Sequence, residues 1–336
     1  MSGASSLVHN IETTGRSALP DTFQAYRAAF DVQAWYSSGE LYYRVDTELS
    51  TDYSSKFEQC RVHSWFARQV DTGEVKVISS ACRLRWCSLC SNARRGYITH
   101  QVSEWIKKAR YPKFLTLTLK HSDAPLSHQV NSLYAYFRKF RKAKFVRDSA
   151  PGGIWFFQIK RSKNTGQWHP HIHCVIEGNY MPHKKLSKLW QNITYGSSVV
   201  DIRPVRDLEK GAAEVARYAS TPADLTTNSP DDYLELFQSL HGRRSCGTWG
   251  TAKKVSLRQP KAEEVHKWEN IGSWSIVYAT QDSEPIAQAI IHAWISNSPL
   301  DAGFTLAINA KLLAEDGVDR IIEKPAPYLP GFYTPP

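Results

Sequence analysis

The clearest pattern in this chain lies in residues 168–176, which read WHPHIHCVI. Histidine occupies every second position from His169 to His173, and alternate side chains of a β-strand lie on the same face. Imidazole groups that share one face of a rigid sheet can hold a metal ion. A polar edge strand with unrelated histidines is the alternative interpretation, so the flanking sequence has to distinguish the two.

A β-hairpin is expected around the histidines. Gly152-Gly153 begins a strand that runs through Lys160, and a turn at residues 163–166 returns the chain to a strand at residues 171–176. Upstream, residues 114–119 read FLTLTL, and this alternation of apolar residues with threonine predicts another strand. Between these strands, residues 126–142 carry apolar side chains at helical spacing.

Three further elements are predicted after the hairpin. They are an amphipathic helix at residues 183–192, a strand at 198–203 and a helix at 208–220 that ends before Thr221-Pro222. The order β-α-β-β-α-β predicts an α+β fold, in which a central antiparallel sheet has the split βαβ arrangement of ferredoxin-like and RRM-like domains. Helices then cover one face of the sheet, and the other face is free to hold a site.

The chain divides into four predicted segments. Residues 1–56 form an N-terminal extension with a short helix near 21–30 and a strand near 40–45, and residues 57–105 contain clustered cysteines. Residues 106–255 form the α+β core. Residues 256–336 form a mostly helical C-terminal region of unassigned role, with helices at 286–295 and 304–313.

The composition indicates the class of partner. The formal net charge is +10, which favours a polyanionic partner such as nucleic acid, or an anionic membrane surface. The longest apolar run, residues 286–295, is too short to cross a bilayer, so no membrane partner is expected. The first residues lack the charged and apolar regions of a secretory signal, and the expected location is the cytoplasm.

Cysteines at positions 82, 87 and 90 predict a structural zinc site. Cys87 and Cys90 have the two-residue separation of a zinc knuckle, and Cys82 supplies a third thiolate. Cys60 is the natural fourth ligand, and His63 competes for that place. A redox pair is the alternative, but no thioredoxin-like βαβ pattern surrounds these residues. Two other cysteines, Cys174 and Cys246, are expected to be unligated.

Glu214 and Tyr218 are four residues apart in a predicted helix, so they lie on the same helical face. A tyrosine hydroxyl can attack a phosphodiester and retain it as a phosphotyrosine. A neighbouring carboxylate can take the proton from that hydroxyl, or later from water. An ordinary solvent-facing pair is the alternative for these two residues taken alone.

Three motifs in this order resemble those of the HUH endonucleases. They are residues 114–120 (FLTLTLK), 168–173 (WHPHIH) and 214–218 (EVARY). The chain most closely resembles the single-tyrosine plasmid rolling-circle replication initiators (Rep) of the staphylococcal-plasmid type, over roughly residues 60–255. The resemblance implies an HUH nuclease core in residues 106–255 and a zinc-binding segment in residues 57–105.

The resemblance also implies roles for individual residues. His171 and His173 would bind a divalent ion, Mg²⁺ or Mn²⁺, and His169 would either support the turn or be a further ligand. Tyr218 would be the nucleophile that forms a 5′-phosphotyrosine, and Glu214 would activate the water or hydroxyl that ends the cycle. The family carries cysteines at corresponding places before its first motif, which favours Cys60 as the fourth zinc ligand.

One position departs from the family pattern. Gln158 stands where the family has a glutamate as third metal ligand. An amide oxygen can ligate a hard cation, but it brings no charge to the site. Lys160, two residues further, faces the same way and is expected to touch DNA.

The motifs together predict a metal-dependent enzyme that nicks and rejoins single-stranded DNA at a plasmid origin. Basic residues are expected to contact that DNA, namely Lys120, Lys160, Arg217, Arg243 and Arg244. A host helicase, a single-strand-binding protein and a DNA polymerase are implied as partners by the resemblance alone. An HUH transposase or mobilisation relaxase would use the same chemistry, and a zinc-stabilised DNA-binding regulator without catalysis is an alternative from another class.

Overall fold

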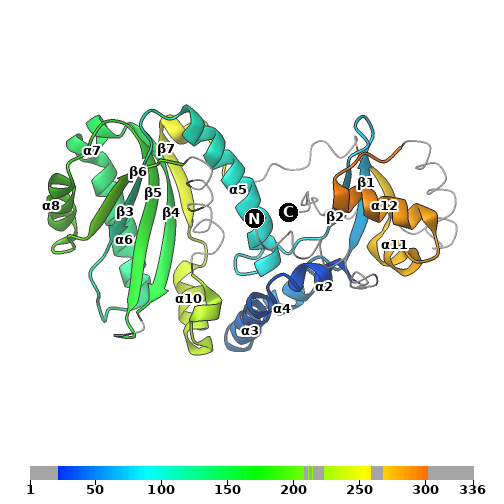
Figure 1. The fold of residues 1–336 in the computed structure, drawn as a ribbon. Coiled ribbons are helices and arrows are strands. Elements are labelled where there is room, and N and C mark those ends of the chain that lie inside the picture. The colour runs from blue at the N-terminus through cyan, green and yellow to red at the C-terminus, as the bar shows by residue number, and fades with distance from the viewer. Residues whose placement is uncertain are drawn as a thin grey trace. The chain divides into compact units, whose positions relative to one another are not determined.

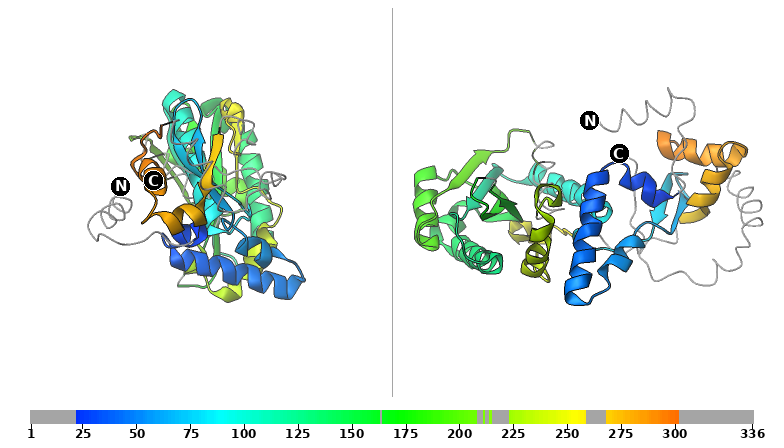
Figure 2. Two further views of the ribbon diagram at one scale, coloured as in Figure 1. Left: turned by 90° about the vertical axis from the view of Figure 1, so that its right-hand side faces the viewer. Right: turned by 90° about the horizontal axis from the view of Figure 1, so that it is seen from below.

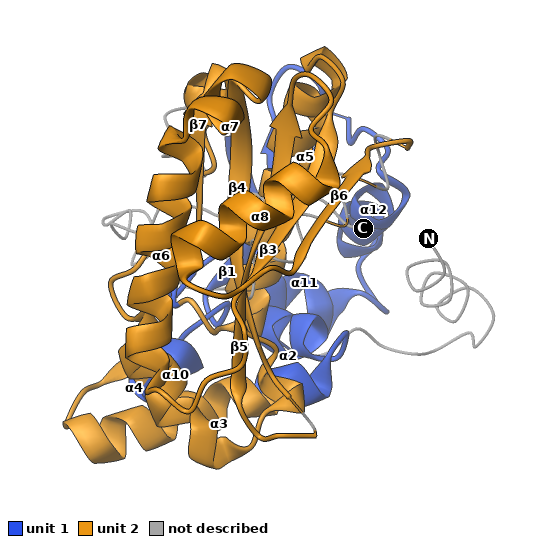
Figure 3. Cartoon of the chain, turned by 90° about the vertical axis from the view of Figure 1, so that its left-hand side faces the viewer, with its two compact units in different colours: residues 1–35, 54–84, 260–336 blue, residues 36–53, 85–259 orange. Residues whose placement is uncertain are grey.

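The computed structural model describes residues 22–162, 164–207, 211, 214, 223–258 and 268–301. The chain splits into two compact units, each with its own antiparallel sheet (Figure 3). One unit contains residues 36–53 and 85–259, and the other contains residues 1–35, 54–84 and 260–336. The division into four segments that the sequence predicts, at residues 1–56, 57–105, 106–255 and 256–336, remains a prediction.

The larger unit is built on five strands in the order β6-β3-β5-β4-β7, and all neighbouring pairs are antiparallel (Figure 1). The helix α6 (Leu126–Lys142) connects β3 to β4, and α8 (His183–Thr194) connects β5 to β6. The strands and helices predicted for residues 114–203 are confirmed, with ends that differ by a few residues. The strands are β3 (Lys113–Thr118), β4 (Gly152–Arg161), β5 (Trp168–Glu177), β6 (Val200–Pro204) and β7 (Cys246–Gly250).

Helices α6 and α8, with the short α7 (Lys144–Ser149), lie on one side of this sheet (Figures 1 and 2). The apolar residues of α6 recur with the helical period, so they form one stripe along the helix. This stripe is buried against the sheet. The ring centroid of Phe137 is 5.8 Å from that of Trp155 on β4. The indole of Trp190 on α8 donates a hydrogen bond of 2.8 Å to the carbonyl of Thr118, which ties α8 to the end of β3.

The opposite side of the sheet is partly covered, which corrects the expectation that it is free. Helix α5 (Ser88–Lys108) buries Ile98, Val102 and Ile106 in one cluster with residues of β4 and β5. Those sheet residues are Ile154, Phe156 and Val175. The cover reaches the end of β5 near Val175, and the alternating histidines lie towards the other end of the strand.

The smaller unit has a three-stranded antiparallel sheet in the order β2-β1-β8. Its core is aromatic, since Phe66 on β1 stacks on Trp274 with ring centroids 5.3 Å apart. The sequence predicted a mostly helical C-terminal region, but the strand β8 was not foreseen, and the predicted helix at 304–313 lies outside the described residues. The elements are α2 (Phe23–Ala28), α4 (Tyr53–Glu58), β1 (Ser64–Gln69), β2 (Val75–Ser79), β8 (Trp268–Ser273), α11 (Trp274–Thr280) and α12 (Pro285–Ser296).

The predicted strand near residues 40–45 is wrong, because this segment belongs to the helix α3 (Val32–Leu49). Ser38, Leu41, Tyr42 and Val45 are buried with the i, i+3, i+4, i+7 spacing of one helical face.

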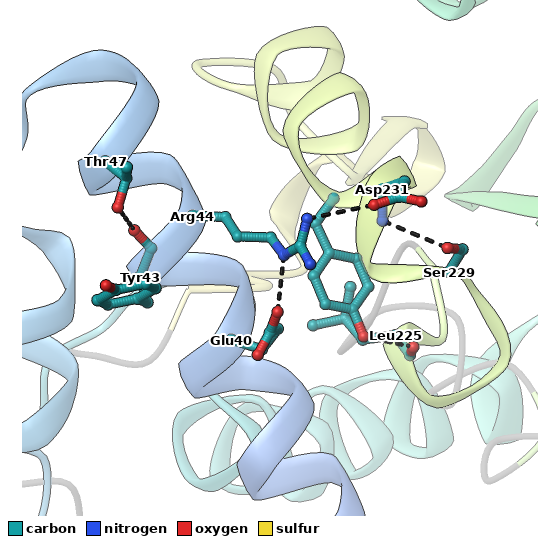
Figure 4. A network of polar contacts seen from close by, with 8 residues as sticks. Glu40, Tyr43, Arg44, Thr47, Leu225, Ser229 and Asp231 are labelled. Carbon is teal, nitrogen blue, oxygen red and sulfur yellow. Dashed lines mark hydrogen bonds and ion pairs between the residues drawn. The ribbon is translucent and has the colours of Figure 1, made fainter.

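An exposed ion pair joins the second half of α3 to the segment that precedes α10 (Tyr233–Leu240). Arg44 donates hydrogen bonds to Glu40, at 2.7 Å, and to Asp231, at 3.3 Å (Figure 4). Because these groups are exposed, the pair adds little stability.

Among the described residues, no helix has both the length and the apolar character needed to span a bilayer.

Candidate functional site

Two threonines of β3 hold the rings of two histidines of β5. Thr118 lies opposite His171 and Thr116 lies opposite His173, so these side chains share one face of the sheet. In each pair the threonine Oγ1 is 3.1 Å from the histidine Nδ1. A partner at Nδ1 fixes the ring and directs Nε2 towards a ligand, as in protein metal sites.

Gln158 on β4 completes this group. It lies opposite His171 in register, and its Oε1 is 2.9 Å from Nε2 of His173. Two neighbouring ligands of an octahedral ion with bonds of about 2.1 Å lie about 3.0 Å apart. The amide oxygen and the imidazole nitrogen lie at hydrogen-bond distance, which is also close to the spacing of two ligands of one ion, so these groups could hold a divalent cation.

Both imidazoles are held in the neutral form. Burial, with the charges of the neighbouring histidines and Lys160, lowers the pKa of His171 to about 3. Burial, with the charges of Lys160 and Arg203, lowers the pKa of His173 to about 4. Neutral imidazole is the form that binds metals.

A second pair of rings extends the histidine face. His169 stacks on His121, with ring centroids 4.3 Å apart and planes 20° from parallel. Lys160 lies opposite His169 in register and is exposed. Lys120, which is also exposed, is anchored through its backbone N–H to Ser197 Oγ at 2.9 Å. Both lysines predicted to touch DNA thus lie at the histidine end of the sheet.

Glu214 forms an ion pair with Arg203 on β6. Arg203 lies opposite Phe114 in register, and its guanidinium carbon is 5.1 Å from the centre of that ring. Phe114 has the same parity along β3 as Thr116 and Thr118, so these groups lie on the face of the sheet that carries the histidines.

Because Gly211 has no side chain, its segment can lie close to this face of the sheet. A side chain at that position would begin 3.1 Å from the Phe114 ring and 2.9 Å from Val205. Gly211 and Glu214 are both helical, as predicted. The predicted nucleophile Tyr218 and its neighbour Arg217 lie outside the described residues.

Arg243 and Arg244 lie just before β7, and the structure does not bring them to the histidines. The guanidinium of Arg243 donates to the side chain of Asn131 on α6. The carbonyl of Arg244 accepts a hydrogen bond of 2.6 Å from Tyr134, also on α6. The side chain of Arg244 is exposed.

The four predicted cysteine ligands form one group. The sulfur atoms of Cys60, Cys82, Cys87 and Cys90 all lie within 4.8 Å of one another. Tetrahedral zinc with Zn–S bonds of about 2.3 Å separates its sulfurs by about 3.8 Å, so this group can hold a metal such as zinc. The competing ligand, His63, is exposed and is not a member of the group.

The other two cysteines lie in the larger sheet. Burial raises the pKa of the thiols of Cys174 and Cys246, which favours the protonated form over the thiolate that binds zinc.

Sequence reasoning missed several side chains around the histidines, namely Thr116, Thr118, His121 and Arg203. A signal existed for the threonines, because they alternate with the same two-residue period as the histidines. Nothing in the local sequence pairs Arg203 with Glu214, since that contact depends on how the helix crosses the sheet.

Comparison with known proteins gave one match. A family model described as "Replication protein" matches residues 75–299. No matching curated protein and no matching solved structure was found. The matched range contains the whole five-stranded sheet, its histidines, Gln158 and three of the clustered cysteines, while Cys60 precedes it.

Proposed function

The chain belongs to the replication protein family, and from this premise we propose that it initiates rolling-circle replication of a plasmid by cutting one strand at the origin. In the proposed reaction the phenol oxygen of Tyr218 attacks the scissile phosphorus. The new Tyr–O–P bond forms as the P–O3′ bond breaks. The phenol gives up its proton to solvent, and the leaving 3′ oxygen takes one up, so a 5′-phosphotyrosine and a free 3′-OH result.

The observation that supports this proposal most is the position of Gln158, which contacts His173 and lies opposite His171 on the face of the sheet that carries both histidines. Gln158 Oε1 lies 2.9 Å from Nε2 of His173, and a threonine of β3 lies against the Nδ1 of each histidine ring. A divalent ion of the Mg²⁺ or Mn²⁺ type bound there would polarise the phosphate and offset its developing charge. Lys160 and Lys120, exposed at the same end of the sheet, would contact the flanking phosphates.

The strand order also supports an HUH core. The connection from β3 through α6 to β4 leaves β5 between the two strands, and the connection from β5 through α8 to β6 leaves β3 between them. We interpret these interleaved crossovers as the split βαβ arrangement. They make β3 and β5 neighbours at the centre of the sheet, where the threonines and histidines meet.

Glu214 is proposed to act at the end of the cycle. Its ion pair with Arg203 keeps a carboxylate on the histidine face, and Tyr218 follows it by four residues in the sequence. The carboxylate would take a proton from the water or hydroxyl that attacks the phosphotyrosine. Arg217 would contact the DNA.

The remaining assignments are structural or concern partners. The four cysteines are proposed to form a closed zinc site without chemistry of its own. Plasmid origin DNA is the expected partner of a replication initiator. A host helicase, a single-strand-binding protein and a polymerase are proposed to follow it, in the cytoplasm. Arg243 and Arg244 would contribute to DNA binding from the side of α6.

A nicking assay tests this function. A supercoiled plasmid that carries the origin of the gene's own replicon is incubated with the protein and Mn²⁺. The wild type and the control Tyr195→Phe, which alters a tyrosine that is 77% exposed, should give nicked circles. Tyr218→Phe should bind the origin without nicking it. Nicking by Tyr218→Phe would overturn the proposal, and origin binding without nicking by the wild type would favour a non-catalytic regulator.

A further inference from the structure

The helices of the larger unit carry a basic surface that the proposed cutting site does not use. It comprises the exposed lysines and arginines of three helices, and we name it the basic helical patch. Its members are Arg138, Lys139 and Lys142 on α6, Lys144 and Arg147 on α7, and Lys184, Lys185 and Lys188 on α8.

These cations form one continuous surface. The chain passes from α6 into α7 through a single residue, Ala143. The amine of Lys185 lies 4.2 Å from the centre of the Phe145 ring, which brings the first turn of α8 against α7. The rings of Phe140 and Trp190 join α6 to α8, with centroids 5.8 Å apart. Figure 3 shows the three helices together on one side of the sheet.

The patch is not neutralised by its own helices. Asp148 is the one carboxylate that α6, α7 and α8 contain, and it pairs with Lys144 and, at 3.9 Å, with Arg147. None of the cations on α6 and α8 has an acidic neighbour within its own helix. Like charges at this density repel one another, so a polyanion would relieve the repulsion.

Helix stability explains only part of the patch. Lys139 and Lys142 are in the last turn of α6, where positive charge is favourable. Lys184 and Lys185 are in the first turn of α8, where positive charge opposes the helix dipole, and that turn has no acidic residue. The cations at the start of α8 are therefore unfavourable for the helix itself, which points to a ligand.

We propose that the basic helical patch binds the sugar–phosphate backbone of duplex DNA. None of the exposed large apolar side chains of the described residues lies on α6, α7 or α8. Single-strand binding relies on exposed aromatic residues, and membrane surfaces take up apolar ones. Exposed tyrosines flank α8 at Tyr180 and Tyr195, but the patch itself consists of cations, which fits phosphate contacts without base stacking. The duplex would lie on the side of the sheet opposite the histidines.

This inference goes beyond the proposed cutting reaction and does not depend on Tyr218. It is tested with the full chain and a duplex of arbitrary sequence, whose dissociation constant is measured by fluorescence anisotropy at several salt concentrations. The variant is Lys184→Gln with Lys185→Gln and Lys188→Gln. The control changes three exposed cations that follow β7, namely Lys253→Gln, Lys254→Gln and Arg258→Gln.

The patch variant should lose about 0.9 from the slope of log affinity against log salt for each phosphate contact removed. The control should keep the wild-type slope. An unchanged slope in the patch variant, or an equal loss in the control, would overturn the proposal. An equal loss of affinity for an unpaired oligonucleotide would also overturn it, because the patch would then not be specific for duplex DNA.

Two further measurements separate the duplex-binding test from misfolding of a variant and from the cutting reaction. The substitutions Arg138→Gln, Lys139→Gln and Lys142→Gln on α6 should reproduce the loss if the α8 variant does not fold. Cutting of a single-stranded origin oligonucleotide should be unchanged in both patch variants. Nicking by Tyr218→Phe would overturn the cutting reaction but not duplex binding by the patch. An unchanged salt slope in the patch variants would overturn duplex binding but not the cutting reaction.

Discussion

The side-chain oxygen of Gln158 lies 2.9 Å from Nε2 of His173, although the two residues are on different strands. Strand pairing produces this relationship, since Gln158 is opposite His171 and the two histidines are two residues apart on the same face. Gln158 thus places a neutral amide oxygen against the imidazole of His173. A neutral amide is expected to bind a divalent ion more weakly than a carboxylate in the same place would.

Gln158→Glu should tighten Mn²⁺ binding by about tenfold or more, because a carboxylate adds a negative charge to a site of neutral ligands. Isothermal titration with Mn²⁺ measures the change. Gln191→Glu, which adds the same charge at an exposed position of α8, is the control and should leave the affinity unaltered. An affinity that is the same in both variants would remove Gln158 from the ligand set.

Thr118→Val should weaken Mn²⁺ binding by about 10- to 100-fold, because it removes the hydroxyl that fixes the ring of His171 and keeps the shape of the side chain. The same titration reports the loss. Thr248→Val on β7 makes the same change of atoms away from these rings and should have little effect. Equal affinities for the wild type and Thr118→Val would show that the hydroxyl does not position the ring.

The purified chain should contain one zinc ion, and Cys90→Ser should lose it, because a structural site needs all four thiolates. Elemental analysis gives the zinc content, and thermal unfolding should show a lower midpoint after chelation. Cys246→Ser should keep its zinc, since that thiol lies in the five-stranded sheet. Zinc retained by Cys90→Ser would refute the four-cysteine site.

Glu214→Ala should retain the first cut and lose the last step, because the carboxylate is proposed to activate the terminating nucleophile. The expected products are multimeric strands or protein that stays covalently joined to DNA, both visible on denaturing gels. Glu235→Ala is not a suitable control, since Glu235 accepts hydrogen bonds from Leu126 and Trp168. Glu104→Ala on α5 changes an exposed carboxylate instead, and it should behave as wild type. Equal loss of both steps in Glu214→Ala would contradict this division of roles.

The sequence predicted the histidine-bearing sheet well because period-two patterns are local. The threonines of β3 and the histidines of β5 each alternate with apolar residues, and burial of the apolar set fixes both register and facing side. The same reasoning failed at residues 40–45. Leu41, Tyr42 and Val45 suggest a strand when only these few residues are considered, whereas the helical period becomes clear when Ser38 is included.

Contacts between distant segments were harder to foresee. Strand β8 reads WENIGS, which lacks an alternating pattern, and its place is set by pairing with β1 about 200 residues earlier. The cover of α5 over Ile154 and Val175 likewise depends on tertiary packing. Cys60 was predicted as the fourth zinc ligand with His63 as a competitor, and only the family resemblance favoured Cys60, because no local spacing connects it to Cys82.

The most direct test of the cutting reaction identifies the covalent bond itself. A single-stranded oligonucleotide that spans the origin is cut in the presence of Mn²⁺, the protein is digested, and the peptide joined to DNA is sequenced by mass spectrometry. We predict one adduct, on the peptide that contains Tyr218, with the tyrosine oxygen linked to a 5′-phosphate. Cleavage with no protein–DNA adduct, or an adduct on a different residue, would contradict the account.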